Sequence, residues 1–130
     1  MKIKDIEIKN SKIHGKGVFA NRNFKKGEIV VKYNLKLLTK KEFKELPEKE
    51  KHYTDFHDGK YWLFQEPERY VNHSCDANTK QVLNKELKCD IATRSIKKGE
   101  EITADYSREN IPGLNMECNC GSKNCTGIIN

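Results

Sequence analysis

Three cysteines lie within the last thirteen residues of the chain: Cys118, Cys120 and Cys125. Thiolate sulfur is a preferred zinc ligand, and structural zinc sites are closed by four ligands arranged as a tetrahedron. Scattered cysteines are often only small buried hydrophobes, but a C-x-C-x4-C run favours a metal. A fourth thiol must come from elsewhere, and on spacing alone Cys75 and Cys89 both qualify. The sequence therefore predicts a zinc site that includes the end of the chain.

Two further segments carry residues suited to binding a ligand. Asn72-His73-Ser74-Cys75 places an amide and an imidazole, both able to donate and accept hydrogen bonds, beside a thiol. The alternative for this segment is a capped polar turn with a satisfied histidine. In Gly15-Lys16-Gly17, the glycines let the backbone approach a ligand closely or adopt positive φ, although a plain tight turn has the same composition.

Short strands must position these segments. Apolar and alternating runs, separated by turn residues, predict strands near residues 3–8, 15–20, 29–33, 61–64, 79–83, 87–92 and 102–104. Asp58-Gly59 is typical of a hairpin turn. The aromatic strand 61–64 is expected to belong mainly to the core. The pattern predicts a mainly β protein with several small sheets and without the strand–helix alternation of a parallel fold.

A helical insertion and a short sequence pattern that occurs twice complete the expected elements. Thr39-Lys40-Lys41-Glu42 is a capping-box pattern that predicts a short helix, which Pro47 interrupts before a second turn. Residues 24–29 (FKKGEI) are similar in sequence to residues 96–102 (IKKGEEI). Two copies are too few for a repeat protein, so we expect two similar turns, each leading into a strand.

Length and charge suggest a single basic domain. The chain has 130 residues, 34% of them charged and 35% hydrophobic, so the core is expected to be modest, and a structural metal would help to stabilise it. The net charge is +6, and residues 1–26 alone hold eight basic and two acidic residues. Such a basic edge could contact nucleic acid or an acidic protein surface, or reflect a lysine-rich composition without a partner.

The sequence suggests an intracellular location. There is no apolar run of membrane-spanning length and no secretory leader, and clustered thiols in an odd total of five favour metal binding over disulfides. Two N-x-S/T sequons, at Asn72 and Asn124, are treated as chance matches. We expect a cytoplasmic protein in a prokaryote, or a nuclear, chromatin-associated one in a eukaryote.

Four blocks of the chain resemble the SET domain, the family of protein-lysine methyltransferases that use S-adenosylmethionine. Residues 15–20 (GKGVFA) are similar to its G-x-G motif, and residues 69–78 (RYVNHSCDAN) to its R-F-x-N-H-S-C-x-P-N motif. Residues 99–106 (GEEITADY) resemble its G-E-E-L-x-x-D-Y motif, and residues 118–127 (CNCGSKNCTG) its post-SET zinc segment. The blocks occur in the family's order, and the second and fourth are the most specific.

The resemblance implies a fold and a complete set of metal ligands. It implies the SET fold of several small sheets, with a pseudoknot near the C-terminus that brings the Asn72 and Tyr106 regions together. Residues 1–110 would form the SET domain and 111–130 the zinc-binding post-SET segment, as one compact unit. The cysteine of N-H-S-C would complete the zinc site, so Cys89 would be a buried strand residue. The implied zinc ligands are Cys75, Cys118, Cys120 and Cys125.

The resemblance also implies a cofactor site and a reaction, the methylation of a lysine ε-amine in a histone or another protein. Tyr106 matches the family's catalytic tyrosine and would orient the reacting groups; without the resemblance it would be a half-buried tyrosine at a strand end. Ala104 is smaller than the Phe or Tyr found there in many members, which predicts more than monomethylation. Residues implied to contact S-adenosylmethionine are His14, Gly15, Lys16, Tyr53, Arg69, Asn72, His73 and Asn119.

Two other functions fit the same residues. One is a SET-like module that binds a peptide without turnover. The other is a basic zinc protein that binds nucleic acid through the N-terminal region, although the thiol run lacks the histidines or second C-x-x-C of common zinc fingers. Ala77 and Tyr70 are mild departures from the family pattern, and residues 36–60, which help to choose the substrate in the family, give no readable specificity.

Overall fold

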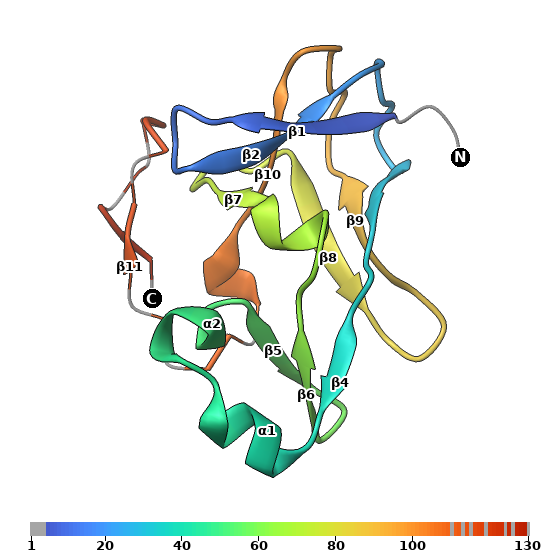
Figure 1. The fold of residues 1–130 in the computed structure, drawn as a ribbon. Helices are drawn as coiled ribbons and strands as arrows, with labels where there is room; N and C mark the ends of the chain where they lie inside the picture. Colours follow the sequence, from blue (N-terminus) through green and yellow to red (C-terminus); the bar gives the residue numbers. More distant parts are fainter. Residues whose placement is uncertain are drawn as a thin grey trace.

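The computed structural model describes residues 5–109, 111–112, 114, 116–118, 120–123, 125 and 127–129. These form small β-sheets connected by turns and loops, a few of which contain short helices (Figure 1). The predicted mainly β class is confirmed. The strands are β1 (Ile6–Asn10), β2 (Lys16–Ala20), β3 (Ile29–Lys32), β4 (Lys36–Leu38), β5 (Thr54–His57), β6 (Lys60–Leu63), β7 (Asn72–His73), β8 (Thr79–Leu83), β9 (Lys88–Ala92), β10 (Glu101–Ala104), β11 (Met116–Glu117) and β12 (Ile128–Ile129).

One sheet brings the segments that carry the motifs together. Its strand order is β1-β2-β10-β7, with β10 antiparallel to β2 and parallel to β7. In the parallel pair, Thr103 lies opposite Asn72 and Ala104 opposite His73. The Ser74 amide donates to the Ala104 carbonyl at 3.0 Å and extends this pairing. The Asn72 and Tyr106 regions are therefore adjacent, as expected for the predicted pseudoknot.

Two three-stranded sheets support this one. The first has the order β3-β9-β8, and the second the order β4-β6-β5. The β5–β6 hairpin turns at Asp58 and Gly59, whose φ angles of 55° and 70° fit the predicted two-residue turn. The β8–β9 hairpin lies where the sequence predicts it. The two-residue β7 and the short β4 were not anticipated, because strands of two or three residues show no periodicity.

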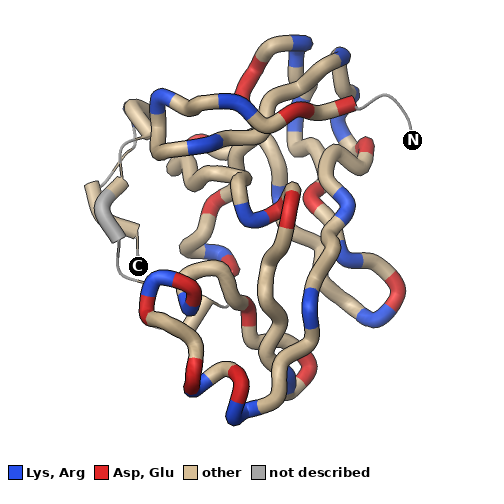
Figure 2. The backbone as a smooth tube through the Cα atoms, viewed as in Figure 1, with Lys and Arg blue, Asp and Glu red and all other residues tan. Residues whose placement is uncertain are grey.

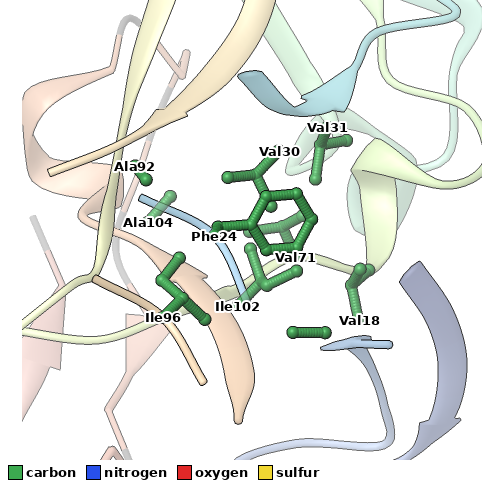
Figure 3. Close-up of a cluster of buried hydrophobic side chains, with 10 residues drawn as sticks. Val18, Phe24, Val30, Val31, Val71, Ala92, Ile96, Ile102 and Ala104 are labelled. Carbon is green, nitrogen blue, oxygen red and sulfur yellow. The ribbon is translucent and has the colours of Figure 1, made fainter. Parts of the chain in front are cut away.

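The core lies between the first sheet and the β3-β9-β8 sheet. Val18 of β2 and Ile102 of β10 lie opposite each other and have no exposed surface, and Phe24 and Val31 pack beside them (Figure 3). The expectation that residues 61–64 belong mainly to the core is only partly correct. Phe64 is buried, but the three residues before it are half-buried, because β6 is the middle strand of the smaller β4-β6-β5 sheet.

The two similar segments, residues 24–29 and 96–102, form matching turns that pair with each other. Phe24 and Ile96 exchange both backbone hydrogen bonds, at 2.8 and 2.9 Å. Gly27 and Gly99 take nearly the same positive φ, 92° and 93°, which favours glycine at both positions. In each turn, the glutamate after the glycine accepts a hydrogen bond from the backbone three residues earlier, at 2.7 and 2.8 Å. Each turn then leads into a strand, β3 or β10.

The helical insertion follows the sequence closely. Helix α1 (Lys40–Glu45) begins at a complete capping box between Thr39 and Glu42, and α2 (Glu48–Lys51) follows Pro47. Two short 3-10 helices, η1 (Glu68–Tyr70) and η2 (Tyr106–Arg108), precede β7 and follow β10. Within the described part of the chain, no helix is both long enough and apolar enough to cross a bilayer.

Candidate active site and thiol cluster

A cleft of about 710 Å³ opens beside β7 and the loop before β2. Its size lies within the range of about 300–1,000 Å³ that is typical of small-molecule sites. Asn119, which the resemblance also implies, lies outside the described residues. The cleft is lined by the other predicted cofactor-binding residues, His14, Gly15, Lys16, Tyr53, Arg69, Asn72 and His73.

Asn72, in β7, holds the loop of His14, Gly15 and Lys16 in place. Its side-chain amide donates to the carbonyl oxygens of His14 at 3.1 Å and Lys16 at 2.9 Å, and to Oε2 of Glu101 at 2.9 Å. The residue is only 7% exposed in this arrangement. Two amide hydrogens serve three acceptors, so the side chain is fully used in shaping the wall of the cleft.

Glu101 is a positioning residue that sequence reasoning missed. Its carboxylate accepts from the Ser11 hydroxyl at 2.8 and 2.9 Å as well as from Asn72. A Cβ on Gly17 would lie 2.3 Å from Oε2 of Glu101, which explains why glycine occupies this strand position. The G-E-E motif marked Glu101, but its partners depend on the β2-β10-β7 pairing, which the sequence does not reveal.

Replacing Glu101 by glutamine is expected to lower the free energy of unfolding by about 1–3 kcal/mol, because hydrogen bonds to a charged acceptor are lost. The adjacent Glu100 is the matched control, because its exposed carboxylate caps only a turn by accepting from the Lys97 amide at 2.8 Å. Glu100→Gln is expected to change stability by less than about 0.5 kcal/mol. Urea unfolding measures both variants, and equal effects would contradict the role of Glu101.

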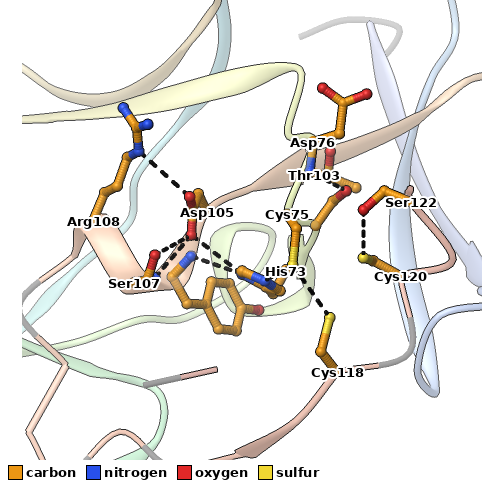
Figure 4. A network of polar contacts seen from close by, with 12 residues as sticks. His73, Cys75, Asp76, Thr103, Asp105, Ser107, Arg108, Cys118, Cys120 and Ser122 are labelled. Carbon is orange, nitrogen blue, oxygen red and sulfur yellow. Dashed lines mark hydrogen bonds and ion pairs between the residues drawn. The ribbon is translucent and has the colours of Figure 1, made fainter. Parts of the chain in front are cut away.

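His73 connects the thiols with the end of β10. Its Nδ1 accepts a hydrogen bond from the Tyr106 amide at 3.0 Å, so this nitrogen carries no proton. Burial lowers the pKa of His73, although the nearby Asp105 opposes the shift. The neutral ring therefore has its proton on Nε2, which lies 3.4 Å from the Cys75 sulfur and donates to it. Figure 4 shows the His73 ring between Asp105 and Cys75.

Four cysteine sulfurs converge next to His73. The sulfurs of Cys75, Cys118, Cys120 and Cys125 all lie within 4.8 Å of one another, and none of the four is in a disulfide bond. The Cys75 and Cys118 sulfurs are 3.9 Å apart. Tetrahedral zinc with bonds of about 2.3 Å separates its sulfur ligands by about 3.8 Å. The donor set and its spacing therefore fit zinc.

The structure distinguishes the two thiols that spacing alone left open. Cys75 lies in the cluster, whereas Cys89 has no exposed surface and sits within β9. One thiol of the cluster already favours its anionic form. Burial opposes this at Cys120, but hydrogen bonds from Ser122 and from the backbone lower its pKa to about 5. A thiolate is the form that binds metal.

Tyr106 lies where the cleft meets a second, much narrower cavity. This cavity holds about 10 Å³, and Tyr106, Tyr53, His52 and Arg69 line both spaces. The Tyr106 hydroxyl donates to the Val71 carbonyl. Burial raises the pKa of Tyr106 well above its ordinary value. The hydroxyl therefore stays protonated and acts as a hydrogen-bond donor.

Arg69 is firmly held at the same junction. Its guanidinium forms a 2.7 Å ion pair with Glu50, donates to the Phe64 carbonyl at 3.1 Å and stacks over the Tyr53 ring at 4.5 Å. These contacts fix the position of Tyr53 between the two spaces. The structure thus gives Arg69 a positioning role in addition to its place in the lining of the cleft.

Comparison with known proteins identifies the family. The sequence model of the SET domain matches residues 15–107. The chain belongs to the SET-domain family. The predicted resemblance is therefore confirmed, and the matched region contains the cleft, the Asn72 loop and Tyr106.

Curated SET proteins align with nearly the whole chain. A variant-silencing SET domain-containing protein of Plasmodium falciparum is 34% identical over 143 residues, covering 95% of this chain and 6% of that protein. Human histone-lysine N-methyltransferase 2B is 31% identical over 150 residues, covering 96% of this chain and 5% of that protein. The chain thus spans only a small part of these long relatives.

A solved structure supports the fold. A crystal structure of a candidate histone methyltransferase from Plasmodium falciparum superimposes with a TM-score of 0.69 and 24% sequence identity. The superposition covers 81% of this chain and 95% of the other. The predicted SET-domain fold is therefore confirmed by structural similarity as well as by sequence.

Proposed function

We propose that this SET domain is an S-adenosylmethionine-dependent protein-lysine N-methyltransferase. The observation that carries the proposal is the junction of a cleft large enough for a cofactor with a narrow cavity, at Tyr53 and Tyr106. Methyl transfer to an amine requires the nucleophile, the carbon and the leaving group to lie in line. Two spaces that meet at one tyrosine pair let the donor and the acceptor approach from opposite sides.

The protein's part in this reaction is to position the reactants and to control protons. Bound cofactor supplies a methyl group activated by a positively charged sulfur. Orienting two reactants can lower the barrier by several kcal/mol, up to about 7–11 kcal/mol. The lysine amine, with an ordinary pKa of about 10.4, must lose its proton, which burial beside a positive charge favours. Tyr106 orients the reacting groups through its protonated hydroxyl and does not act as the general base.

The cofactor contacts follow from the lining of the cleft. The loop of His14, Gly15 and Lys16 offers backbone groups along one wall, and Asn72 and His73 form the adjoining wall. Because Asn72 also holds the loop in place, it supports both walls at once. Tyr53 and Arg69 close the end nearest Tyr106, and Asn119 remains a proposed contact outside the described residues.

The four-cysteine cluster is proposed to bind structural zinc. Cys118 and Ile129 line the cleft, so the segment after residue 110 supplies part of its wall. Among the described residues of this segment, β11 and β12 form a two-stranded sheet of two residues per strand, which cannot hold the segment in place by itself. Zinc would tie the segment to Cys75 at the end of β7. We accordingly propose residues 111–130 as a zinc-binding unit attached to the SET domain.

The proposed substrate is a lysine of a histone or another protein. Relatives of this chain include histone-lysine N-methyltransferases of human and of yeast, the latter specific for H3 lysine 36. A nucleic-acid contact has less support. Residues 9–26 carry six basic residues and no acidic one, but along the rest of the described chain Lys and Arg are interspersed with Asp and Glu (Figure 2). If the chain comes from a eukaryote, a chromatin substrate and a nuclear location follow from this proposal.

Calorimetric titration of S-adenosylmethionine into zinc-loaded protein tests the proposal. We expect wild type to bind and Asn72→Ala to bind at least about tenfold more weakly, because three hydrogen bonds are lost. Asn84→Ala, in the β8–β9 turn, is the control and should bind like wild type. Transfer of labelled methyl groups to core histones then separates an enzyme from a module that only binds. Absence of cofactor binding with and without histone peptides would overturn the proposal.

We propose that the side chain at position 104 limits the degree of methylation. Ala104 lines the narrow cavity and is smaller than the Phe or Tyr that many family members carry there. We expect wild type to add more than one methyl group, and Ala104→Val to shift the products toward monomethyl-lysine. Mass spectrometry of the product peptides measures both. Ala20→Val, another buried strand alanine, controls for overpacking, and a wild-type product that is only monomethylated would contradict the prediction.

A further inference from the structure

A buried carboxylate lies in the wall of the narrow cavity. Asp90, in the middle of β9, is 2% exposed and lines this cavity together with Tyr33 and Tyr106. Tyr33 follows the neighbouring strand β3, and its hydroxyl donates to Oδ1 of Asp90. Among the described residues, this is the hydrogen bond that the structure shows to the Asp90 carboxylate. Because Asp90 also lines the cavity, its carboxylate can contact a group that enters.

Two other charged groups lining the cavity, Glu68 and Arg69, already have polar partners. Both oxygens of Glu68 accept from the backbone, from Asn34 at 2.9 Å and from Gln65 at 2.8 Å. The Arg69 guanidinium is bound to Glu50 and to the Phe64 carbonyl. For Glu109, burial and the nearby Asp90 carboxylate raise the pKa well above its ordinary value, which favours the neutral form. Asp90 is therefore the acid of the cavity that can face an incoming group.

The size and charge of the cavity select the kind of group. A space of about 10 Å³ holds about one water molecule, and an ammonium group is of similar size. A buried carboxylate is costly unless a positive charge or hydrogen bonds compensate it. Burial and the neighbouring Glu68 raise the pKa of Asp90 to about 7, although the Tyr33 hydrogen bond opposes the shift. An entering cation would favour the charged carboxylate.

We propose that Asp90, oriented by Tyr33, is the residue that recognises the ammonium group of the substrate side chain in the narrow cavity. This inference rests on the proposed function, because it takes the cavity as the place of the acceptor amine. It predicts a preference for a cationic amine over neutral groups of the same length. It also leaves Tyr106 to orient the reacting groups at the junction with the cleft.

The test uses a small probe, so that it does not depend on catalysis. n-Butylammonium has the length and charge of a lysine side chain, and 1-pentanol is a neutral probe of similar length. Binding is followed by the carbon-13 signal of the Asp90 carboxyl group in zinc-loaded wild type, and by heteronuclear shifts around the cavity in the variants. We expect the amine to bind wild type at least about tenfold more tightly than the alcohol, as for a charge-assisted hydrogen bond.

Asp90→Asn is expected to weaken amine binding at least about tenfold, while still offering Tyr33 an acceptor oxygen. Asp58→Asn, an equal change of charge in the β5–β6 turn, should bind like wild type. Glu109→Gln is expected to bind within about twofold of wild type, because burial already favours the neutral form of the group it replaces. Should Asp90→Asn fail to fold, Tyr33→Phe, which removes one hydroxyl, is expected to bind the amine about two- to tenfold more weakly.

Amine binding by Asp90→Asn within twofold of wild type, or equal binding of both probes, would overturn the assignment. If Glu109→Gln loses more amine affinity than Asp90→Asn does, Glu109 is the recognising residue and the assignment to Asp90 is overturned as well. Loss of amine selectivity in Asp90→Asn supports it even where methyl transfer is absent, and then only the proposed function fails. In an active enzyme, the same variant is expected to raise KM for a lysine peptide without changing the cofactor dissociation constant.

Discussion

Replacing Tyr106 by phenylalanine is expected to lower the turnover number for methyl transfer about a hundredfold, as when one positioned donor is removed from an active site. Cofactor affinity should stay within about threefold of wild type, because the aromatic ring remains in the wall of the cleft. The physical reason is that Tyr106 acts through a hydroxyl that stays protonated, since burial raises its pKa. The ring alone cannot orient the methyl group and the amine.

Single-turnover rates with saturating cofactor, together with calorimetry of cofactor binding, separate these two effects. Tyr61→Phe is a suitable control. Tyr61 of β6 stacks on Phe43 of α1 with ring centroids 3.9 Å apart, and the ring keeps this contact when the hydroxyl is removed. If Tyr106→Phe retains more than half of the wild-type rate, Tyr106 only anchors the Val71 carbonyl and has no part in the reaction.

Replacing Cys75 by serine is expected to release zinc and to weaken cofactor binding about a hundredfold. Changing a group that only supports a metal ligand typically lowers metal affinity tenfold to hundredfold. Removing a ligand itself is expected to lower zinc affinity further. Cys75 joins the C-terminal thiols to β7, and Cys118 in that segment lines the cleft. Without the metal, the wall that this segment supplies is no longer held against the rest of the domain.

Zinc content by elemental mass spectrometry and cofactor binding by calorimetry measure the two parts of this prediction. Cys89→Ala is the matched control, because Cys89 is a buried thiol of β9 outside the cluster. It should keep one zinc ion per chain and wild-type cofactor affinity, with a modest loss of stability. Retention of zinc by Cys75→Ser, or its loss from Cys89→Ala, would show that the cluster has been assigned incorrectly.

Much of the local structure could be predicted from the sequence. The Asp58-Gly59 turn, the β8–β9 hairpin and the capping box of α1 depend on residues close together in the chain, and all lie where expected. Seven of the residues that the resemblance implied as cofactor contacts line the cleft. It also indicated Cys75 as the thiol that joins the C-terminal cluster.

The remaining parts of the site depend on contacts between distant residues. Asn72 meets Glu101 because β7 and β10 pair in parallel, and such a pairing leaves no pattern within either strand. Asp90 looks like an ordinary polar position of a hairpin until β9 is seen as the middle strand of its sheet, facing the cavity. In both cases the tertiary arrangement, not the local preference of the residue, determines its role.

The position of β10 between β2 and β7 has a consequence for the folding of the protein. The walls of the cleft come from segments far apart in the chain, such as His14 and Asn72, which are separated by 58 residues. Proteins dominated by such distant contacts fold slowly, because long loops must close before the contacts form. A growing chain therefore has no cofactor site until residues 101–104 have been synthesised and inserted. Cofactor that binds only the finished cleft would then favour the folded state by mass action.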